Sequence, residues 1–192
     1  MRSLLATTLT ALLLSFAPAD AQDARALLDA ADKALGAAGL KSFEMTAGGV
    51  SYAVGQAQAP GGAWPRFNVK SLARSVNYET ASLRDTSVRT QAEDPPRGGG
   101  VQPVRGEQRQ VGVVGGEHAW NVVGDAAIPA PITLAARQLE LWATPHGIVR
   151  AARANNATAQ GRTLVFAVPG KYTARATLDR AVYLPEIGRA HV

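Results

Sequence analysis

Apolar side chains recur at three- and four-residue spacing between Asp23 and Ala38. The apolar positions are Ala24, Leu27, Leu28, Ala31 and Leu35, and the charged residues on the other side are Arg25, Asp29, Asp32 and Lys33. This period is typical of an α-helix that buries one stripe of its surface. Gly39 follows the pattern and is expected to end the helix in a left-handed conformation. The sequence therefore predicts an amphipathic helix over residues 23–38.

The pattern then changes to the two-residue alternation of β-strands. Segments rich in β-branched and aromatic residues are 41–47, 50–57, 66–78 and 83–91. Turn-forming residues separate them at Gly48-Gly49, at Pro60-Gly61-Gly62 and near Glu79, which indicates antiparallel hairpins. The alternation changes phase between Phe67 and Tyr78, so a β-bulge is predicted near Ser71.

A loop is predicted at residues 93–107, where two adjacent prolines and the glycines 98–100 exclude regular structure. Strands are expected to resume at 108–114 and 119–123, around the turn Gly115-Gly116. This part of the chain therefore adds another antiparallel hairpin.

Two helices are expected to interrupt the strands in the second half of the chain, over residues 132–142 and 146–154. Thr144 is predicted to cap the second helix, with Pro145 in its first turn and Asn155-Asn156 at its end. The remaining predicted elements are strands 162–168, 172–178 and 181–184, the first two joined by a turn at Pro169-Gly170.

One helix, several hairpins, a helical excursion and more hairpins describe an α+β domain. We expect a meandering, antiparallel and curved β-sheet, with helices packed on its apolar face. Residues 22–185 are sufficient for a sizeable hydrophobic core, so one domain is predicted over this range.

The first 21 residues have the pattern of a secretory signal peptide. Arg2 precedes an apolar stretch from Leu4 to Phe16, and Ala19 and Ala21 form an A-x-A cleavage pattern. The apolar stretch is too short to span a bilayer, so no stable membrane span is expected. The sequence has no cysteine and hence no disulfide framework. We therefore predict an exported protein, periplasmic or secreted.

The 192-residue chain carries a formal net charge of +5. A basic balance can indicate a nucleic-acid partner, but the arginines here are scattered singly from Arg25 to Arg180. Because no basic run or stripe interleaved with aromatic residues is present, no nucleic-acid partner is predicted. The charge is expected to contribute mainly to solubility.

No catalytic, cofactor-binding or metal-binding residue is predicted in this chain. A catalytic zinc site needs three or four ligands at one point, often with two of them closely spaced in sequence. The three histidines, His118, His146 and His191, are not paired at such spacing. His118 is expected to be a polar residue at a strand edge. His146 is expected to pack at a helix N-terminus, with a substrate anion as the alternative role.

Other short patterns also fail to predict chemistry. The glycines 98–100 lack the Lys-Ser/Thr of a phosphate-binding loop, and residues 49–53 lack the final glycine of a nucleophile elbow. Glu93-Asp94 is expected to be solvent-exposed in the predicted loop. Asn156-Ala157-Thr158 matches a glycosylation acceptor, which is a short and common pattern.

The three tryptophans, Trp64, Trp120 and Trp142, stand in apolar surroundings. We expect each of them to anchor the core, because an indole ring buries a large apolar area. The alternative is that they line one cavity between sheet and helices, which would hold an apolar ligand or a lipid chain.

The last seven residues, EIGRAHV, differ in character from the chain before them. Residues 187–192 can be encoded by a string that resembles a widely used sequencing adapter. The expectation is therefore that residues 186–192 are not native, that Pro185 is the last genuine residue and that the natural protein continues.

Several long stretches between residues 53 and 172 resemble the N-terminal region of exported bacterial metallo-β-lactamase-fold hydrolases. They are AVGQAQAPGGAWPRFNVKS, NYETASLRDTSVRTQAEDPPRGGG, GEQRQ, AWNVVG, LELWATPHG and VPGKY. The resemblance implies that the zinc-binding H-x-H-x-D-H segment lies in a separate downstream α/β domain, which would be the partner of this one. No position here matches that segment, so no catalytic residue is carried over.

Two functions follow as expectations. The first is a non-catalytic N-terminal accessory domain of an exported zinc-dependent hydrolase, with zinc only in the missing downstream domain. The alternative is a stand-alone periplasmic binding module that holds an apolar ligand or lipid between sheet and helices. The sequence makes no prediction of oligomeric state.

Overall fold

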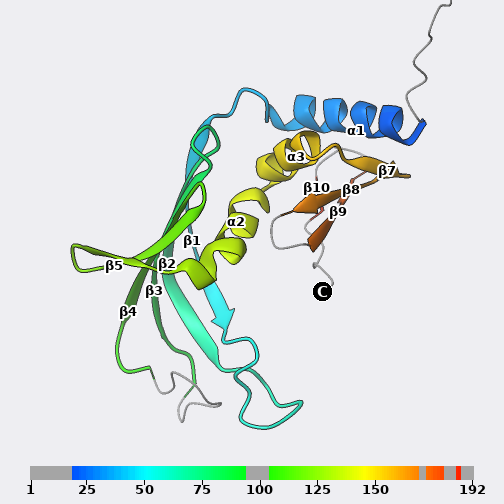
Figure 1. Ribbon diagram of the computed structural model, residues 1–192. Coiled ribbons are helices and arrows are strands. Elements are labelled where there is room, and N and C mark those ends of the chain that lie inside the picture. The colour runs from blue at the N-terminus through cyan, green and yellow to red at the C-terminus, as the bar shows by residue number, and fades with distance from the viewer. Residues whose placement is uncertain (1–18, 94–103, 169–171, 180–184, 187–192) are drawn as a thin grey trace, which may run out of the picture.

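A computed structural model describes residues 19–93, 104–168, 172–179 and 185–186 (Figure 1). The helices are α1 (Ala19–Leu35), α2 (Leu134–Trp142) and α3 (Pro145–Ala154), and the 3₁₀ turn η1 (Pro131–Thr133) leads into α2. The larger sheet contains β1 (Ser42–Tyr52), β2 (Arg66–Asn77), β3 (Ser82–Gln91), β4 (Gln108–Gly115), β5 (His118–Val123) and β6 (Ala126–Pro129). The smaller sheet contains β7 (Thr158–Gln160), β8 (Thr163–Val168), β9 (Tyr172–Leu178) and β10 (Pro185–Glu186).

The described chain is an α+β fold, as the sequence predicts. The strands of the larger sheet follow one another in chain order, so it is an antiparallel meander, and Figure 1 shows that its long strands curve. The C-terminal strands pair in a second antiparallel sheet instead of extending the first. The strands β6 and β7 were not predicted from the sequence, whereas the predicted strand at 181–184 and the turn at Pro169-Gly170 lie outside the described residues.

The β-bulge predicted near Ser71 is confirmed, because the pairing of β2 with β3 shifts register between Val69 and Ser71. The hairpin predicted at Gly48-Gly49 is wrong. These glycines lie within β1, where the register with β2 shifts between Ala47 and Gly49. The physical reason is that β2 is long enough to pair with the chain on both sides of the glycines, so the extra residue becomes a bulge and not a turn.

The helix α1 is amphipathic as predicted, but its ends differ from the prediction. It begins at Ala19 and ends at Leu35. Gly36, not Gly39, adopts the left-handed conformation, with φ of 65°, and its N–H donates to the carbonyl oxygen of Asp32 at 2.8 Å. The first glycine after the last apolar position therefore ends the helix.

Two apolar cores hold the elements together. One joins α1 and α3 to the smaller sheet through Ala24, Leu28, Ala31, Val149, Ala152, Leu164, Phe166 and Leu178. The other joins the larger sheet to the end of α2 through Val76, Tyr78, Leu83, Val114 and Leu141. Trp142 packs against both cores. Each fully buried leucine contributes about 1.5–3 kcal/mol, so these two clusters are the main source of stability.

The register of the larger sheet places unlike residues in successive rows under α2. Val76, Leu83 and Val114 are paired across β2, β3 and β4 and form an apolar row. The next row on the same face contains Arg74, Asp85, Gly112 and Asn121. The sheet face that lies under α2 is therefore apolar at one end and charged at the other.

No helix in the described part of the chain is long and apolar enough to cross a membrane.

Candidate functional site

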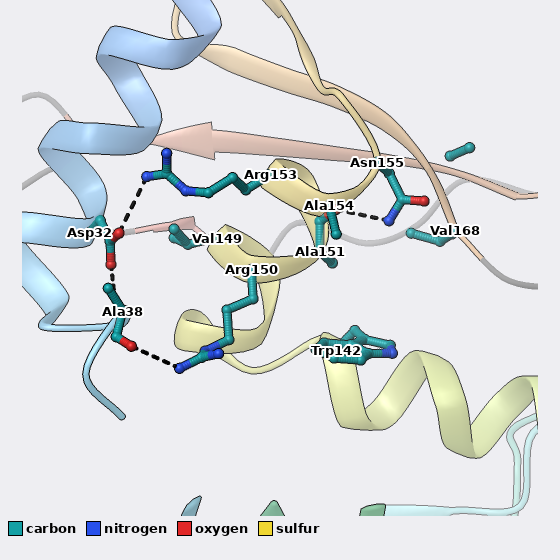
Figure 2. Close-up of a pocket in the computed structure, with 11 residues that line it drawn as sticks. Asp32, Ala38, Trp142, Val149, Arg150, Ala151, Arg153, Ala154, Asn155 and Val168 are labelled. Carbon is teal, nitrogen blue, oxygen red and sulfur yellow. Dashed lines mark hydrogen bonds and ion pairs between the residues drawn. The ribbon is translucent and has the colours of Figure 1, made fainter. Parts of the chain in front are cut away.

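An open cleft of about 850 Å³ lies between α1, the end of α2, α3 and the end of β8 (Figure 2). We refer to it as the α1–α3 cleft. Its lining residues are Asp32, Ala38, Trp142, Val149, Arg150, Ala151, Arg153, Ala154, Asn155, Ala167 and Val168. Segments that are far apart in the sequence thus meet at one concave surface.

One side of the α1–α3 cleft is apolar. Figure 2 shows Trp142 and Val168 on the same side, with Ala154 nearby on α3. The position of Trp142 is fixed because α2 ends at this residue and α3 begins three residues later. Thr144 caps α3 by accepting a hydrogen bond from the Gly147 N–H at 3.1 Å, as its sequence position predicts.

The other side of the α1–α3 cleft carries charge. Arg153 on α3 donates to Asp29 at 3.0 Å and to Asp32 at 3.2 Å, both on α1. Asp32 also accepts a hydrogen bond from the Ala38 N–H at 2.6 Å. These contacts join α1 to α3 at the rim, and 43% of the Arg153 side chain remains exposed.

Arg150 holds the linker between α1 and β1. Its Nη2 donates to the carbonyl oxygens of Ala37, Ala38 and Leu40 at 2.9, 3.2 and 2.5 Å. Its guanidinium lies 5.0 Å from the centre of the Tyr78 ring, a cation–π arrangement. Its Nε is buried and has no hydrogen-bond partner among the described residues. The contacts of this guanidinium are therefore carbonyl groups and a ring, with no carboxylate among them in the described chain.

A cluster of three aromatic side chains, Phe43, Tyr78 and Trp142, lies behind the cleft. The rings of Tyr78 and Trp142 stack with 5.9 Å between centroids and 23° between planes, and Phe43 lies 6.1 Å from Tyr78. The Tyr78 hydroxyl lies 2.6 Å from the Thr144 hydroxyl. Burial raises the pKa of Tyr78 above 10.0, although the hydrogen bond with Thr144 and the charge of Arg150 oppose this shift. The rings of Phe43 and Tyr78 therefore pack behind Trp142 and hold it in place on the apolar side of the cleft.

A second cleft, of about 630 Å³, lies between α2 and the charged row of the larger sheet. Arg74 donates to both carboxylate oxygens of Asp85, at 2.7 and 2.5 Å, and lies 3.7 Å from Glu140 on α2. The hydrogen bond with Asp85 raises the pKa of Arg74, and burial raises the pKa of Glu140 above 4.5. These charges satisfy one another, so the cluster attaches α2 to the sheet.

Arg137 provides a second attachment in this cleft. Its guanidinium donates to the carbonyl oxygens of Val113 and Trp120 at 3.1 and 2.7 Å and to Asn121 Oδ1 at 2.5 Å. It lies directly over Gly112, where an added Cβ would be 3.0 Å from the guanidinium carbon. A glycine at this position therefore makes room for the arginine.

The two histidines that the structure describes, His118 and His146, do not line either cleft. His118 is exposed at the start of β5, and His146 lies in α3 with its ring 6.2 Å from that of Phe43. His191 and the glycines 98–100 lie outside the described residues. In the ranges that the structure describes, no group of three or more His, Cys, Asp or Glu side chains could hold a metal ion.

Three expectations about side chains are wrong. Trp64 does not anchor the core, because 45% of it is exposed in the loop between β1 and β2. The tryptophans also do not line one cavity, since only Trp142 lines the α1–α3 cleft and Trp120 packs over Gly115. The expected exposure of Glu93 is also wrong: it lies two residues after the end of β3 and is partly buried, with a buried Oε2 atom. Asp94 lies outside the described residues.

Sequence reasoning missed the charged side of the α1–α3 cleft. Arg150 and Arg153 are three residues apart, and this spacing places them on one face of a helix. That signal was available, but their partners on α1 and its linker are more than 100 residues away.

Comparison of the chain with protein-family models, with curated proteins and with solved structures gives no match.

Proposed function

We propose that this chain is a non-catalytic binding module of an exported protein and that the α1–α3 cleft holds an apolar ligand. One observation carries the proposal, namely an open cleft of about 850 Å³ with an apolar side that contains Trp142, Ala154 and Val168. Small-molecule sites are concave, mostly apolar and roughly 300–1,000 Å³ in volume. The ion pairs of Arg153 with α1 support binding as the role of the cleft, because they stabilise its rim.

Binding of the neutral dye N-phenyl-1-naphthylamine tests this proposal, because the fluorescence of the dye increases in apolar surroundings. The purified chain is expected to bind it saturably. Ala167→Trp, which fills the cleft from β8, is expected to weaken binding about tenfold. Ala126→Trp, at an exposed position on the distant edge strand β6, is the matched control and should bind as the wild type does. Equal losses in both variants, or no saturable binding, would contradict the proposal.

A second candidate function is favoured by the resemblance of the sequence to exported metallo-β-lactamase-fold hydrolases. On this basis the chain is an accessory N-terminal domain, and a downstream domain of the same polypeptide binds zinc and performs the hydrolysis. One of the resembling stretches, LELWATPHG, contains Trp142 of the cleft wall and Thr144, which caps α3. The cleft would then contribute to substrate binding.

Genomic sequence on long reads separates the two candidates. An in-frame H-x-H-x-D-H downstream of Pro185 supports the accessory domain, and a native stop codon directly after Val192 supports the stand-alone module. The present chain is expected to bind no stoichiometric zinc by elemental analysis and to hydrolyse no β-lactam or ester. Zinc-dependent turnover by this chain would contradict both candidates.

A further inference from the structure

The α1–α3 cleft separates apolar surface from charge. In Figure 2, Trp142 and Val168 lie at one end, and Arg150, Arg153 and Asp32 lie at the other. A ligand that is apolar throughout would make no polar contact with these charged groups. A ligand with an apolar chain and a polar head matches both ends.

The charged end combines two arginines, Arg150 and Arg153, with two carboxylates, and both carboxylates pair with Arg153. Two guanidinium groups and one carboxylate, that of Asp32, line the cleft. Arg153 divides its ion pairs between Asp32 and Asp29, and its side chain is 43% exposed. The pair with Asp29 is exposed and therefore weak and screened by salt, whereas Asp32 is only 19% exposed, so an incoming anion would compete with Asp29 for this guanidinium.

Arg150 is the stronger indication of an anionic head. Among the described residues its Nη2 donates only to carbonyl oxygens, and its guanidinium lies over the Tyr78 ring. In the described chain no carboxylate contacts it, and its buried Nε makes no hydrogen bond. A buried or half-buried cation without a counter-charge is unfavourable, and an anion in the cleft would supply that charge.

We propose that the ligand of the α1–α3 cleft is a free single-chain amphiphile with an anionic head. Its carboxylate or phosphate lies at Arg150 and Arg153, and its alkyl chain lies against Trp142 and Val168. The inference rests on the proposed function and names the ligand class of the same site.

Dodecanoate and dodecanol test the inference, because they share one chain length and differ in the charge of the head. Each is titrated below its aggregation concentration into the chain loaded with N-phenyl-1-naphthylamine. Dodecanoate is expected to displace the dye at about tenfold lower concentration than dodecanol. This preference should decrease as sodium chloride is raised, because the interaction is between charges.

Arg153→Gln is expected to remove most of the preference for dodecanoate and to leave dodecanol displacement unchanged. Arg84→Gln, which removes an exposed arginine from β3 in the larger sheet, is the matched control and should retain the preference. Thermal melting of both variants shows whether they remain folded. The salt series on the wild type tests the charge independently of any variant.

The outcomes separate this inference from the proposed function. If dodecanol displaces the dye as well as dodecanoate does, the anionic head is wrong and the apolar cleft stands. If the dye does not bind, the proposed function is contradicted, and the inference that rests on it is contradicted with it. Loss of the preference in Arg84→Gln as well would indicate general surface attraction and overturn the inference. Flotation with phosphatidylglycerol vesicles, without any dodecanoate binding, would assign the charge to a membrane surface and also overturn it.

Discussion

The hydroxyl groups of Tyr78 and Thr144 lie 2.6 Å apart, although 66 residues separate them in the sequence. Tyr78 follows the last residue of β2, and Thr144 is the N-cap of α3. This hydrogen bond therefore joins the larger sheet to the helix that forms the α1–α3 cleft. It also places the Tyr78 ring against Trp142, which lines the cleft.

Tyr78→Phe is expected to lower the free energy of unfolding by about 1–2 kcal/mol, because a buried hydrogen bond is lost while the ring packing is retained. Urea denaturation followed by tryptophan fluorescence measures the change. The control is Tyr52→Phe, since Tyr52 is 53% exposed, and its effect should stay within about 0.5 kcal/mol. Equal effects of the two variants would show that the Tyr78 hydroxyl does not join the two parts.

Arg74→Met is expected to cost about 3 kcal/mol, because it leaves the largely buried Asp85 without its partner. The double variant Arg74→Met/Asp85→Leu should recover most of this loss, since it removes both charges. Chemical denaturation of the single and double variants gives the coupling. Lys41→Met is the control, because the Lys41–Glu79 pair is exposed and worth at most about 1 kcal/mol. Additive effects at Arg74 and Asp85 would contradict the prediction.

Gly112→Ala is expected to destabilise the protein by about 2 kcal/mol, because the new Cβ would displace the Arg137 guanidinium from its hydrogen bonds. The shift in melting temperature measures this. The same substitution in an Arg137→Met background should cost much less, since the flexible methionine can move aside. A cost that is unchanged in that background would mean that Gly112 serves the strand and not the arginine.

The stability of the protein is expected to depend on pH through Glu140. Burial raises its pKa above 4.5, so the folded protein holds this proton at pH values where the unfolded chain has released it. The unfolded state then binds fewer protons, and stability falls as pH rises from about 4.5 through the folded pKa. In Glu140→Gln this residue cannot titrate, so the variant does not lose this stability as pH rises. The urea midpoint of the wild type should therefore fall relative to that of the variant between pH 4 and pH 7, and parallel profiles would contradict the prediction.

The predicted signal peptide is tested by expression of the whole chain in a Gram-negative bacterium. The protein is expected in the periplasmic fraction, and N-terminal sequencing should begin at Gln22. Leu13→Arg interrupts the apolar stretch and should keep the chain in the cytoplasm, whereas Thr7→Ser should not. Cytoplasmic retention of the unaltered chain would contradict the assignment.

Local signals account for the elements that were predicted correctly. The capping of α3 by Thr144 depends on residues three apart, and the bulge at Ser71 depends on a phase change within one strand. Gly48-Gly49 misled the prediction because a glycine pair suits both a turn and a bulge. Only the length of the partner strand decides between them, and that partner lies about 20 residues further along the chain.

The α1–α3 cleft also depends partly on local sequence signals and partly on tertiary packing. Sequence spacing places Arg150 and Arg153 on one helix face, and the apolar context of Trp142 predicts a packed ring. These side chains line one cleft with Asp32 and Val168 because of the way α1, α3 and β8 pack together. No local pattern in the sequence encodes that packing.

The sequence by itself determined the fold class, the positions of most strands and helices, and an amphipathic first helix, because short-range periodicity and turn chemistry act within a few residues. The tertiary structure alone decided that the strands divide into two sheets, that Trp142 belongs to both cores and that an apolar wall faces two arginines. These features arise from burial between segments far apart in the chain. The free energy of such burial depends on which surfaces meet, and the order of residues does not state that directly.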